Sequence, residues 1–331
     1  MRDTSCGPAE KGRHRMGKAR RSASLVGACL ALSWLLAAPP VATGVELKKG
    51  AVEAFEHYVR LTEARSDGDL RGANPFLWVD GLPEARRQAL YTQLRRGRIV
   101  IERLEEHADG KPIRVPNGLI HHWVGVVFIP GATLQQTMAL VTDYDNHQNV
   151  YRPDVMRSKL LHHNGNHYSI YLRFYKKKII TAVLNTEHEV DFFPLDAERA
   201  YSRSYTTRIA EVENPGQPNE REKPVGDDRG FLWRLNSYWR FQEKAGGVYV
   251  QCESVSLSRD IPRGLGWLIV PFITSVPKES LVRTLEATRA ALLRGPTAGL
   301  PVQGILCLTA AEGARPSSGR PRSVQPLAEE L

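Results

Sequence analysis

The chain contains 331 residues, of which 42% are hydrophobic and 24% are charged, and its formal net charge is +9. These proportions are those of an ordinary globular protein, which excludes disorder over the whole chain. The four cysteines are too few and too scattered for a disulfide scaffold, and no Cys-x-x-Cys pair suggests a structural zinc site. Only one apolar run approaches membrane length, so a protein with several membrane spans is excluded as well.

An export signal is indicated by the first 44 residues. Three basic residues fall within residues 18–21, residues 25–38 are apolar, and Ala42-Thr43-Gly44 offers a small-residue cleavage site. The apolar run of 14 residues is shorter than the about 17–25 residues of a membrane-spanning helix. We therefore expect residues 1–44 to be a signal peptide and the protein to be exported, periplasmic or secreted, after cleavage near Gly44.

Two alternatives concern the same segment. An uncleaved signal would leave a membrane-anchored form of the protein. Met16 stands closer to the basic and apolar segments than Met1 does, so translation from Met16 is an alternative start.

Removal of the signal changes the charge of the protein. Residues 1–44 contain seven basic and two acidic residues, so the remaining chain has a net charge of only +4. Beyond the signal there is no lysine- and arginine-rich helix and no alternation of basic with aromatic residues. Nucleic-acid binding therefore has no support, and we expect no nucleic-acid partner.

Residues 45–118 are expected to form a mainly helical N-terminal extension. Val52, Phe55 and their neighbours one turn on have the spacing of an amphipathic helix. A loop is expected at residues 66–74, and Pro83 begins a second helical stretch. The extension has no obvious core of its own, so we expect it to pack on the part of the chain that follows.

Long strands dominate the chain from residue 119 onward. Gly165-Asn166 and Gly246-Gly247 are hairpin signals, and a short amphipathic helix is expected at residues 132–141. Residues 214–230 are expected to be a long exposed loop. The expected strands cover residues 121–129, 155–162, 167–175, 178–193, 200–212, 231–242 and 248–258.

The last expected element is a long helix that begins after Pro277. Leu281 and Leu285 lie on one face of it, and Gly295-Pro296 ends it. Residues 295–331 are rich in proline, serine, glycine and alanine, and we expect them to be a disordered tail. Antiparallel strands followed by one long helix predict an α+β fold, in which a sheet of so many strands curls around the helix.

Three segments resemble the START-like (SRPBCC) superfamily, which includes polyketide cyclases/aromatases and lipid-transfer domains. They are the strand-to-helix passage Gly125-Val-Val-Phe-Ile-Pro-Gly-Ala-Thr-Leu134, the acidic and aromatic Asp143-Tyr-Asp145, and Arg259-Asp-Ile-Pro262 ahead of the last helix. The similar domain covers residues 119–294. The resemblance implies a helix-grip fold, in which a curved antiparallel sheet wraps around the long C-terminal helix and leaves a cavity between them.

Alternation along the strands identifies the side chains that would face this cavity. On residues 178–193 the inward face is apolar apart from His188, and neighbouring strands add aromatic residues with few polar groups. Such a wall suits an apolar or aromatic small molecule, and the same side chains would equally serve to fill a core. The candidate ligand-binding residues are Tyr168, Leu184, His188, Arg203, Trp233, Trp239 and Phe241.

Two of these candidates carry strongly polar groups. His188 would orient a ligand hydroxyl or act as a general acid or base, whereas a lone inward histidine is also a common hydrogen-bonded core residue. Residues 201–209 have two possible inward faces, and Arg203 would meet a ligand carboxylate or phosphate only from one of them. The sequence assigns no catalytic residue.

Other chemistries find little support. The adjacent pairs His121-His122 and His162-His163 send their rings to opposite sides of a strand, so we expect no metal site, and no cofactor is indicated. No nucleophile elbow, P-loop or dinucleotide-binding motif is present. Lys176-Lys177-Lys178 is a basic turn that would either touch anionic lipid head groups or simply be solvated.

The expected function is that of an exported, non-enzymatic protein that holds a hydrophobic small molecule or lipid between sheet and last helix, with transient contact to a membrane surface. The first alternative is an enzyme of the polyketide cyclase/aromatase or dehydrase type that uses the same cavity. The second is a cell-envelope interaction protein with a filled core. The apolar residues 264–273 would form a cavity gate, a membrane-dipping loop or a buried connection.

Overall fold

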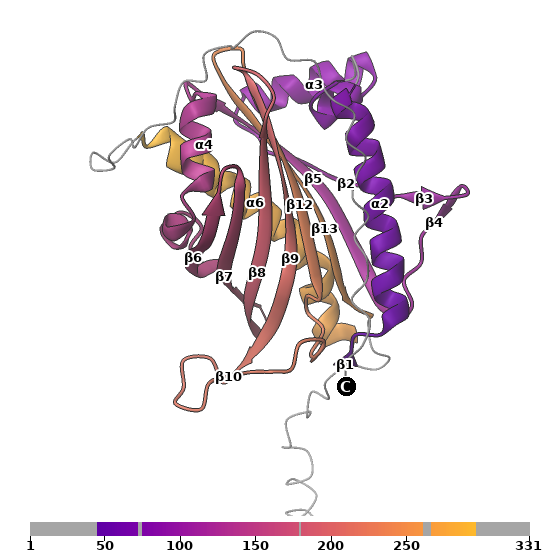
Figure 1. Ribbon diagram of the computed structural model, residues 1–331. Helices are drawn as coiled ribbons and strands as arrows, with labels where there is room; N and C mark the ends of the chain where they lie inside the picture. Colours follow the sequence, from indigo (N-terminus) through magenta and orange to yellow (C-terminus); the bar gives the residue numbers. More distant parts are fainter. Residues whose placement is uncertain (1–44, 72–74, 179, 261–265, 296–331) are drawn as a thin grey trace, which may run out of the picture. The chain divides into compact units, whose positions relative to one another are not determined.

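A computed structural model describes residues 45–71, 75–178, 180–260 and 266–295 of the chain. The expected signal at residues 1–44 and the expected tail beyond Gly295 lie outside the described residues. At the centre of the described part is a nine-stranded sheet (Figure 1). None of the helices described is both long enough and apolar enough to cross a membrane.

The sheet is antiparallel throughout. Its strands follow the order β2-β5-β13-β12-β9-β8-β7-β6, and the short β10 pairs with β9. Two hairpin turns contain Gly165 and Gly246, whose φ angles of 61° and 75° lie in the left-handed region that such turns require. The strands are β2 (Val100–Arg103), β5 (Gly118–Pro130), β6 (Val155–Asn164), β7 (His167–Lys177), β8 (Thr181–Pro194), β9 (Arg199–Glu213), β10 (Arg221–Glu222), β12 (Arg234–Lys244) and β13 (Gly247–Arg259).

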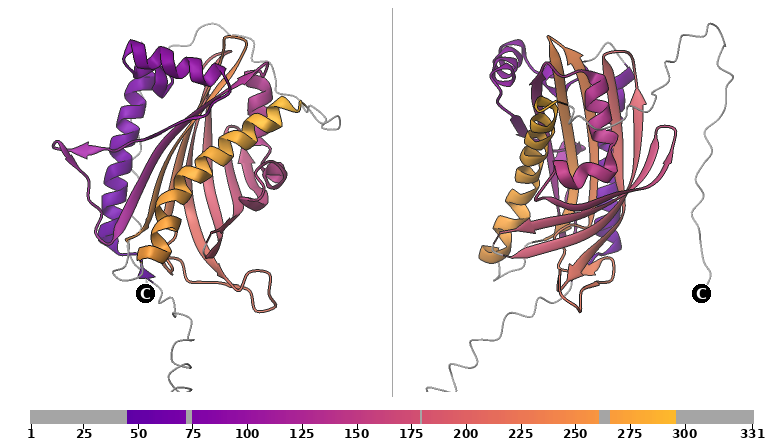
Figure 2. Two further views of the ribbon diagram at one scale, coloured as in Figure 1. Left: turned by 180° about the vertical axis from the view of Figure 1, so that it is seen from behind. Right: turned by 90° about the vertical axis from the view of Figure 1, so that its left-hand side faces the viewer.

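Three helices and a single 3-10 turn lie on the inner face of the sheet. They are α4 (Leu134–Thr142), η2 (Tyr144–Asn146), α5 (His147–Val150) and α6 (Gly266–Leu293). Helix α6 runs diagonally across the strands (Figure 2). The close contact between α6 and β5 depends on Gly125, because a Cβ atom there would lie 2.6 Å from side-chain carbons of both Ile101 and Leu285.

Helix α6 is longer than the sequence predicts. It begins at Gly266, and Pro271 and Pro277 lie inside it, whereas the expected helix begins only after Pro277. A proline removes one hydrogen bond from a helix and does not always end it. The apolar segment 264–273 lies partly outside the described residues, and from Gly266 onward its backbone forms the first part of α6.

The N-terminal extension covers the outer face of the sheet. Helices α2 (Lys49–Arg71) and α3 (Glu84–Arg95), joined through the 3-10 turn η1 (Trp78–Gly81), share two apolar clusters with β5, β12 and β13. Helix α2 continues beyond the expected loop start at Ser66. Its last turns are held against the sheet, since Arg240 of β12 donates to Ser66 Oγ (2.9 Å) and pairs with Asp69.

Two small sheets complete the structure. They pair β1 (Val45–Glu46) with β11 (Asp227–Asp228) and β3 (His107–Ala108) with β4 (Lys111–Pro112). The insert 214–230, expected to be a loop, thus contains β10 and β11. Its position is fixed by Arg173 of β7, whose guanidinium donates two bonds of 2.9 Å to Glu220.

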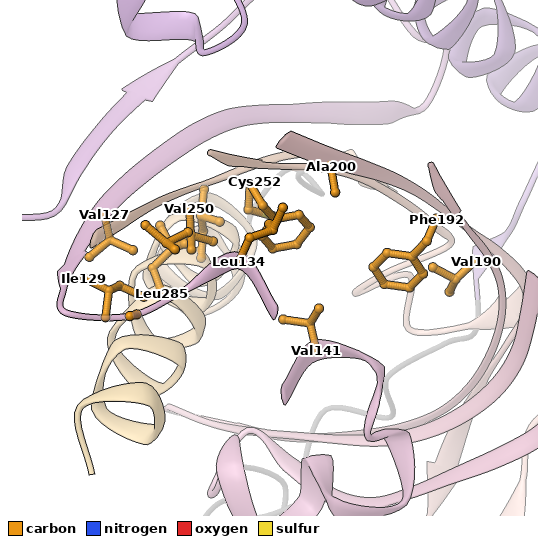
Figure 3. Close-up of a cluster of buried hydrophobic side chains, with 14 of the residues drawn as sticks. Val127, Ile129, Leu134, Val141, Val190, Phe192, Ala200, Val250, Cys252 and Leu285 are labelled. Carbon is orange, nitrogen blue, oxygen red and sulfur yellow. The ribbon is translucent and has the colours of Figure 1, made fainter. Parts of the chain in front are cut away.

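The largest apolar cluster lies between the inner face of the sheet and the helices. In Figure 3, Leu134 and Val141 of α4 and Leu285 of α6 point toward side chains of the strands, among them Val250 and Phe192. This arrangement of a curved antiparallel sheet and a long C-terminal helix confirms the α+β, helix-grip class expected from the sequence.

Candidate functional site: a cavity between sheet and helices

A cavity of about 290 Å³ lies between the inner face of the sheet and the helices that cover it. Its walls come from β5, β7, β8, β9, β12 and β13 on one side and from α4, α5 and α6 on the other. The volume is close to the lower end of the range for small-molecule sites, about 300–1,000 Å³. The described chain therefore leaves space where a filled core would have side chains.

Small side chains on the strands create this space. Ser204, Ser237 and Ser254 are register partners on β9, β12 and β13, and all three line the cavity. In the adjacent row, Ser202 pairs with Trp239 and Trp239 with Cys252. Because the side chains of this central row of serines are short, space remains above the middle of the sheet. Larger residues on either side enclose this space as a cavity.

The remaining wall is mostly apolar. The helices contribute aliphatic and aromatic groups to it. The apolar residues from the strands include Ile170, Leu172 and Phe174 of β7 and Ala182, Leu184, Val190 and Phe192 of β8. An apolar lining with a small number of polar groups is the usual composition of a site for a hydrophobic ligand.

Four of the seven candidate residues line the cavity: Leu184, His188, Trp239 and Phe241. Tyr168 lies beside it in the same apolar cluster, where its ring is 5.5 Å from the rings of Tyr144 and Phe192. Tyr168 therefore packs against residues of the lining without being part of it. The period-two alternation of β7, β8 and β12 thus predicts correctly which of their faces is the inner one.

Arg203 and Trp233 require a correction, because neither lines the cavity. Arg203 lies on the outer face, where its guanidinium pairs with Asp67 of α2. The inner face of β9 is therefore the one with Ser202 and Ser204. Trp233 precedes β12, and its indole N–H donates to Asp228 Oδ1 (3.1 Å) within the apolar cluster under α2. Neither side chain is part of the cavity lining.

His188 is buried in the cavity wall as a neutral imidazole. Burial lowers its pKa to about 4. The Thr186 hydroxyl donates its proton to the carbonyl oxygen of Leu172 (3.0 Å), so it accepts a hydrogen bond from His188 Nε2 (2.9 Å). This fixes the Nε2–H tautomer and leaves Nδ1 as an acceptor, for which the described residues show no partner.

His121 of β5 has the same arrangement on the other side of the cavity. Its Nε2 bonds to the Ser258 hydroxyl (2.9 Å), and that hydroxyl donates to the carbonyl of Arg259 (3.3 Å). Burial, with a smaller contribution from Arg103, lowers the pKa of His121 to about 4. Its Nδ1 is therefore also an acceptor on the cavity wall.

A third histidine, His147 of α5, lies between two tyrosines. Its ring is 4.7 Å from that of Tyr144 and 5.0 Å from that of Tyr151, and all three line the cavity. Burial lowers the pKa of His147 to about 4, and its buried Nε2 has no hydrogen-bond partner among the described residues.

Charged groups gather where the cavity reaches the surface. Arg152, Asp154, Lys176 and Arg283 line this end, and Arg152 is exposed to solvent. Asp154 pairs with Lys176 and lies 3.4 Å from Arg283. Burial lowers the pKa of Lys176 to about 8 despite the pairing with Asp154.

Two lysines of the basic turn therefore have ion-pair partners and are not simply solvated. Lys178 lies 2.6 Å from Glu279 of α6, while Lys176 pairs with Asp154. Both contacts connect the end of β7 or the turn after it to neighbouring elements at the open end of the cavity.

The sequence does not reveal a polar cluster on the outer face that has the composition of a metal site. One ligand atom each of Glu106, His122 and Glu253 lie within 4.8 Å of one another. Arg65, however, donates to Glu106 (3.0 Å) and to Glu253 (2.5 Å), and His122 Nε2 bonds to Glu253 (2.7 Å). These bonds outweigh burial and lower the pKa of Glu253 to about 2. The Arg65 guanidinium thus supplies the positive charge that a metal ion would supply in this cluster.

Besides His121 and His147, the sequence analysis misses the serines of the cavity floor as site residues. They stand at alternate positions, as Ser202-Arg-Ser204 in β9 and Ser254-Val-Ser256 in β13. Alternating hydroxyl groups on a strand are the signal that could have revealed them. The signal is weak, because the same pattern is typical of a solvated strand face.

No protein-family model matches the sequence, and no significant match to a curated protein was found. Solved structures do match. A STAR-related lipid transfer protein fragment from Xanthomonas axonopodis is 17% identical, with 58% of this chain and 98% of that chain covered and a TM-score of 0.39. The Zhui aromatase/cyclase from Streptomyces sp. R1128 is 12% identical, with coverages of 53% and 95% and a TM-score of 0.36.

A START superfamily protein from Mycobacterium smegmatis is 9% identical, with coverages of 54% and 97% and a TM-score of 0.32. The matched proteins are START-type and aromatase/cyclase structures. All three TM-scores lie below 0.5, so these matches carry no conclusion about the fold, the ligand or the activity.

Proposed function

We propose that this protein is an exported carrier that binds one hydrophobic small molecule or lipid in the cavity between the sheet and α6. The observation that supports this proposal is the cavity itself, about 290 Å³ of mostly apolar space at the centre of the domain. Unoccupied apolar space of this size is costly to a folded protein, by about 24 cal/mol per Å³ in cavity-creating variants. A bound apolar molecule would recover the lost contacts.

The charged end of the cavity agrees with uptake from an aqueous phase. Arg152 and Arg283 are exposed there, whereas the opposite walls are apolar. A ligand would therefore enter past polar side chains and lose its contact with water stepwise. Transient contact of this end with an anionic membrane surface is part of the proposal, since Arg152, Lys176, Lys178 and Arg283 outnumber the acids Asp154 and Glu279.

A second candidate function is an enzyme of the cyclase/aromatase or dehydrase type. His188 is the residue that favours this alternative, because its neutral imidazole can accept a hydrogen bond from a substrate hydroxyl, although a pKa of about 4 makes it a weak base at neutral pH. The filled-core alternative, by contrast, does not agree with the cavity. Recovery of a bound compound with unchanged mass after prolonged incubation with the protein supports the carrier, and its conversion supports the enzyme.

Binding of a neutral fluorescent dye, N-phenyl-1-naphthylamine, tests the proposed function. We expect one saturable site per chain and a loss of affinity of at least tenfold in Ser237→Leu, which fills the cavity from its floor. Thr207→Leu is the matched control, since Thr207 lies exposed on β9 and outside the cavity. Failure of the wild type to bind the dye, or equal binding by both variants, would contradict the proposal.

A further inference from the structure

Six of the polar residues that line the cavity lie in two adjacent rows across the sheet. The first row consists of Ser204, Ser237 and Ser254, which are direct register partners. In the second row, His188 lies on β8 and the partners Ser256 and His121 lie on β13 and β5. We call these six residues the polar band. All six line the cavity, and they come from five successive strands of the sheet.

The polar band offers both kinds of hydrogen-bonding group. His188 and His121 each donate through Nε2 to a hydroxyl whose proton is committed to a backbone carbonyl, so each presents Nδ1 as an acceptor. Among the described residues, no side-chain hydrogen bond involves the hydroxyls of Ser204, Ser237 or Ser254. Each of these hydroxyls is therefore available as a donor and an acceptor.

Unused hydrogen-bonding groups in an apolar cavity are selective for the ligand. A buried donor or acceptor without a partner costs about 1–3 kcal/mol, and a ligand with a matching group removes this cost. An aliphatic ligand would leave the two Nδ1 acceptors and the three serine hydroxyls unsatisfied. A ligand with hydroxyl or carbonyl groups on one face would satisfy several of its members at once.

The band contains no charged side chain. Burial keeps both of its histidines neutral at pH 7, since their pKa values lie near 4. The charged residues of the lining, Arg152, Asp154, Lys176 and Arg283, lie together at the open end. An anionic group placed deep in the cavity would meet no cation in the polar band and would keep the full cost of its desolvation.

We infer that the cavity selects an uncharged ligand whose hydroxyl or carbonyl groups lie along one face and contact the polar band. This inference rests on the proposed function and specifies the chemical class of the ligand. It distinguishes this ligand from a plain hydrocarbon and from an amphiphile whose charged head group enters the cavity.

Three probes with one skeleton test the inference: naphthalene, a dihydroxynaphthalene and 2-naphthoate, each titrated against the bound naphthylamine dye. We expect the diol to bind at least tenfold more tightly than naphthalene and at least tenfold more tightly than the anion. In His188→Phe, and separately in the triple variant Ser204→Ala, Ser237→Ala, Ser254→Ala, this preference for the diol over naphthalene should fall to within about twofold.

Thr207→Val is the matched control, because it removes an exposed hydroxyl from β9 outside the cavity. Its preference for the diol should equal that of the wild type. If naphthalene and the diol bind the wild type equally, or if the triple variant retains the preference, the inference is wrong and the proposed function still stands. If none of the probes and no dye bind, the proposed function itself fails.

Discussion

Burial of titratable side chains is the main feature at the scale of single residues. His121, His147 and His188 are neutral in the folded protein because burial lowers each pKa to about 4. In the unfolded chain a histidine titrates near 6.5. Between these values the unfolded state binds more protons than the folded state, so the free energy of unfolding decreases as the pH falls from 6.5 to 4.

One group in the same pH range acts in the opposite direction. Burial raises the pKa of Asp228 to about 6, so between pH 4 and 6 the folded state binds one proton more than the unfolded state there. The three histidines outnumber it. With a net difference of about two protons, the free energy of unfolding changes by about 3 kcal/mol per pH unit.

We therefore predict a steep loss of stability between pH 6 and 4.5. Urea unfolding at several pH values measures it as the slope of the unfolding free energy. His188→Gln, which replaces the imidazole near Thr186 and Phe174, should reduce the slope by about one proton. His162→Gln, which changes an exposed histidine of β6, is the matched control. An equal slope in wild type and His188→Gln would contradict the account.

Sequence reasoning at this scale succeeds where alternation has one possible reading. The inward position of His188 follows from its apolar neighbours on β8. Arg203 could not be placed, because β9 carries polar residues on both faces and the choice depends on α2, which supplies Asp67. Trp233 could not be placed either, since it precedes β12 and its orientation depends on Asp228.

The contact between α6 and β5 is the critical feature at the scale of elements. Gly125 allows Leu281 and Leu285 of α6 to approach the backbone of β5, and Ile101 of β2 packs against the same glycine. The helix closes the cavity only because it can lie this near the sheet. A side chain at position 125 would push the helix away or force the neighbouring side chains from their rotamers.

We predict that Gly125→Val lowers the free energy of unfolding by about 1–3 kcal/mol, the usual effect of overpacking a core. It should also weaken binding of the naphthylamine dye. Gly68→Ala in α2 is the matched control, because a Cβ atom there has no neighbour within 4 Å. Alanine is the better helix former by about 1 kcal/mol, so Gly68→Ala should stabilise the protein. A stable Gly125→Val variant with unchanged dye binding would show that the close contact is not required.

Most element boundaries of the sheet follow from the sequence, because hairpin glycines separate strands of regular alternation. The helices are predicted less well. The end of α2 depends on hydrogen bonds between Ser66 and Arg240, and the beginning of α6 lies upstream of Pro277. The end of α2 is therefore decided by a tertiary contact, and the beginning of α6 by a proline that the helix tolerates. Local sequence patterns reveal neither.

At the scale of the whole domain, the sheet separates two different environments. Its outer face, covered by α2 and α3, holds charged groups in satisfied networks such as that of Arg65 and Glu253. Its inner face holds the cavity, where the hydroxyls of Ser204, Ser237 and Ser254 have no side-chain hydrogen-bond partner within the described part of the chain. The sequence predicts the cavity through the START-like resemblance but not its polar band, because the band exists only when five strands bring single residues into two rows.

The central claim is that the cavity carries a ligand, and native mass spectrometry of the protein purified from its own cell-envelope fraction tests it most directly. We predict a mass above that of the polypeptide by one small molecule, which denaturing extraction releases as an uncharged, hydroxyl- or carbonyl-bearing lipid or aromatic compound. Recovery from the envelope fraction would at the same time support export. A protein that has only its polypeptide mass, and that takes up no neutral apolar compound when this is supplied, would contradict the account.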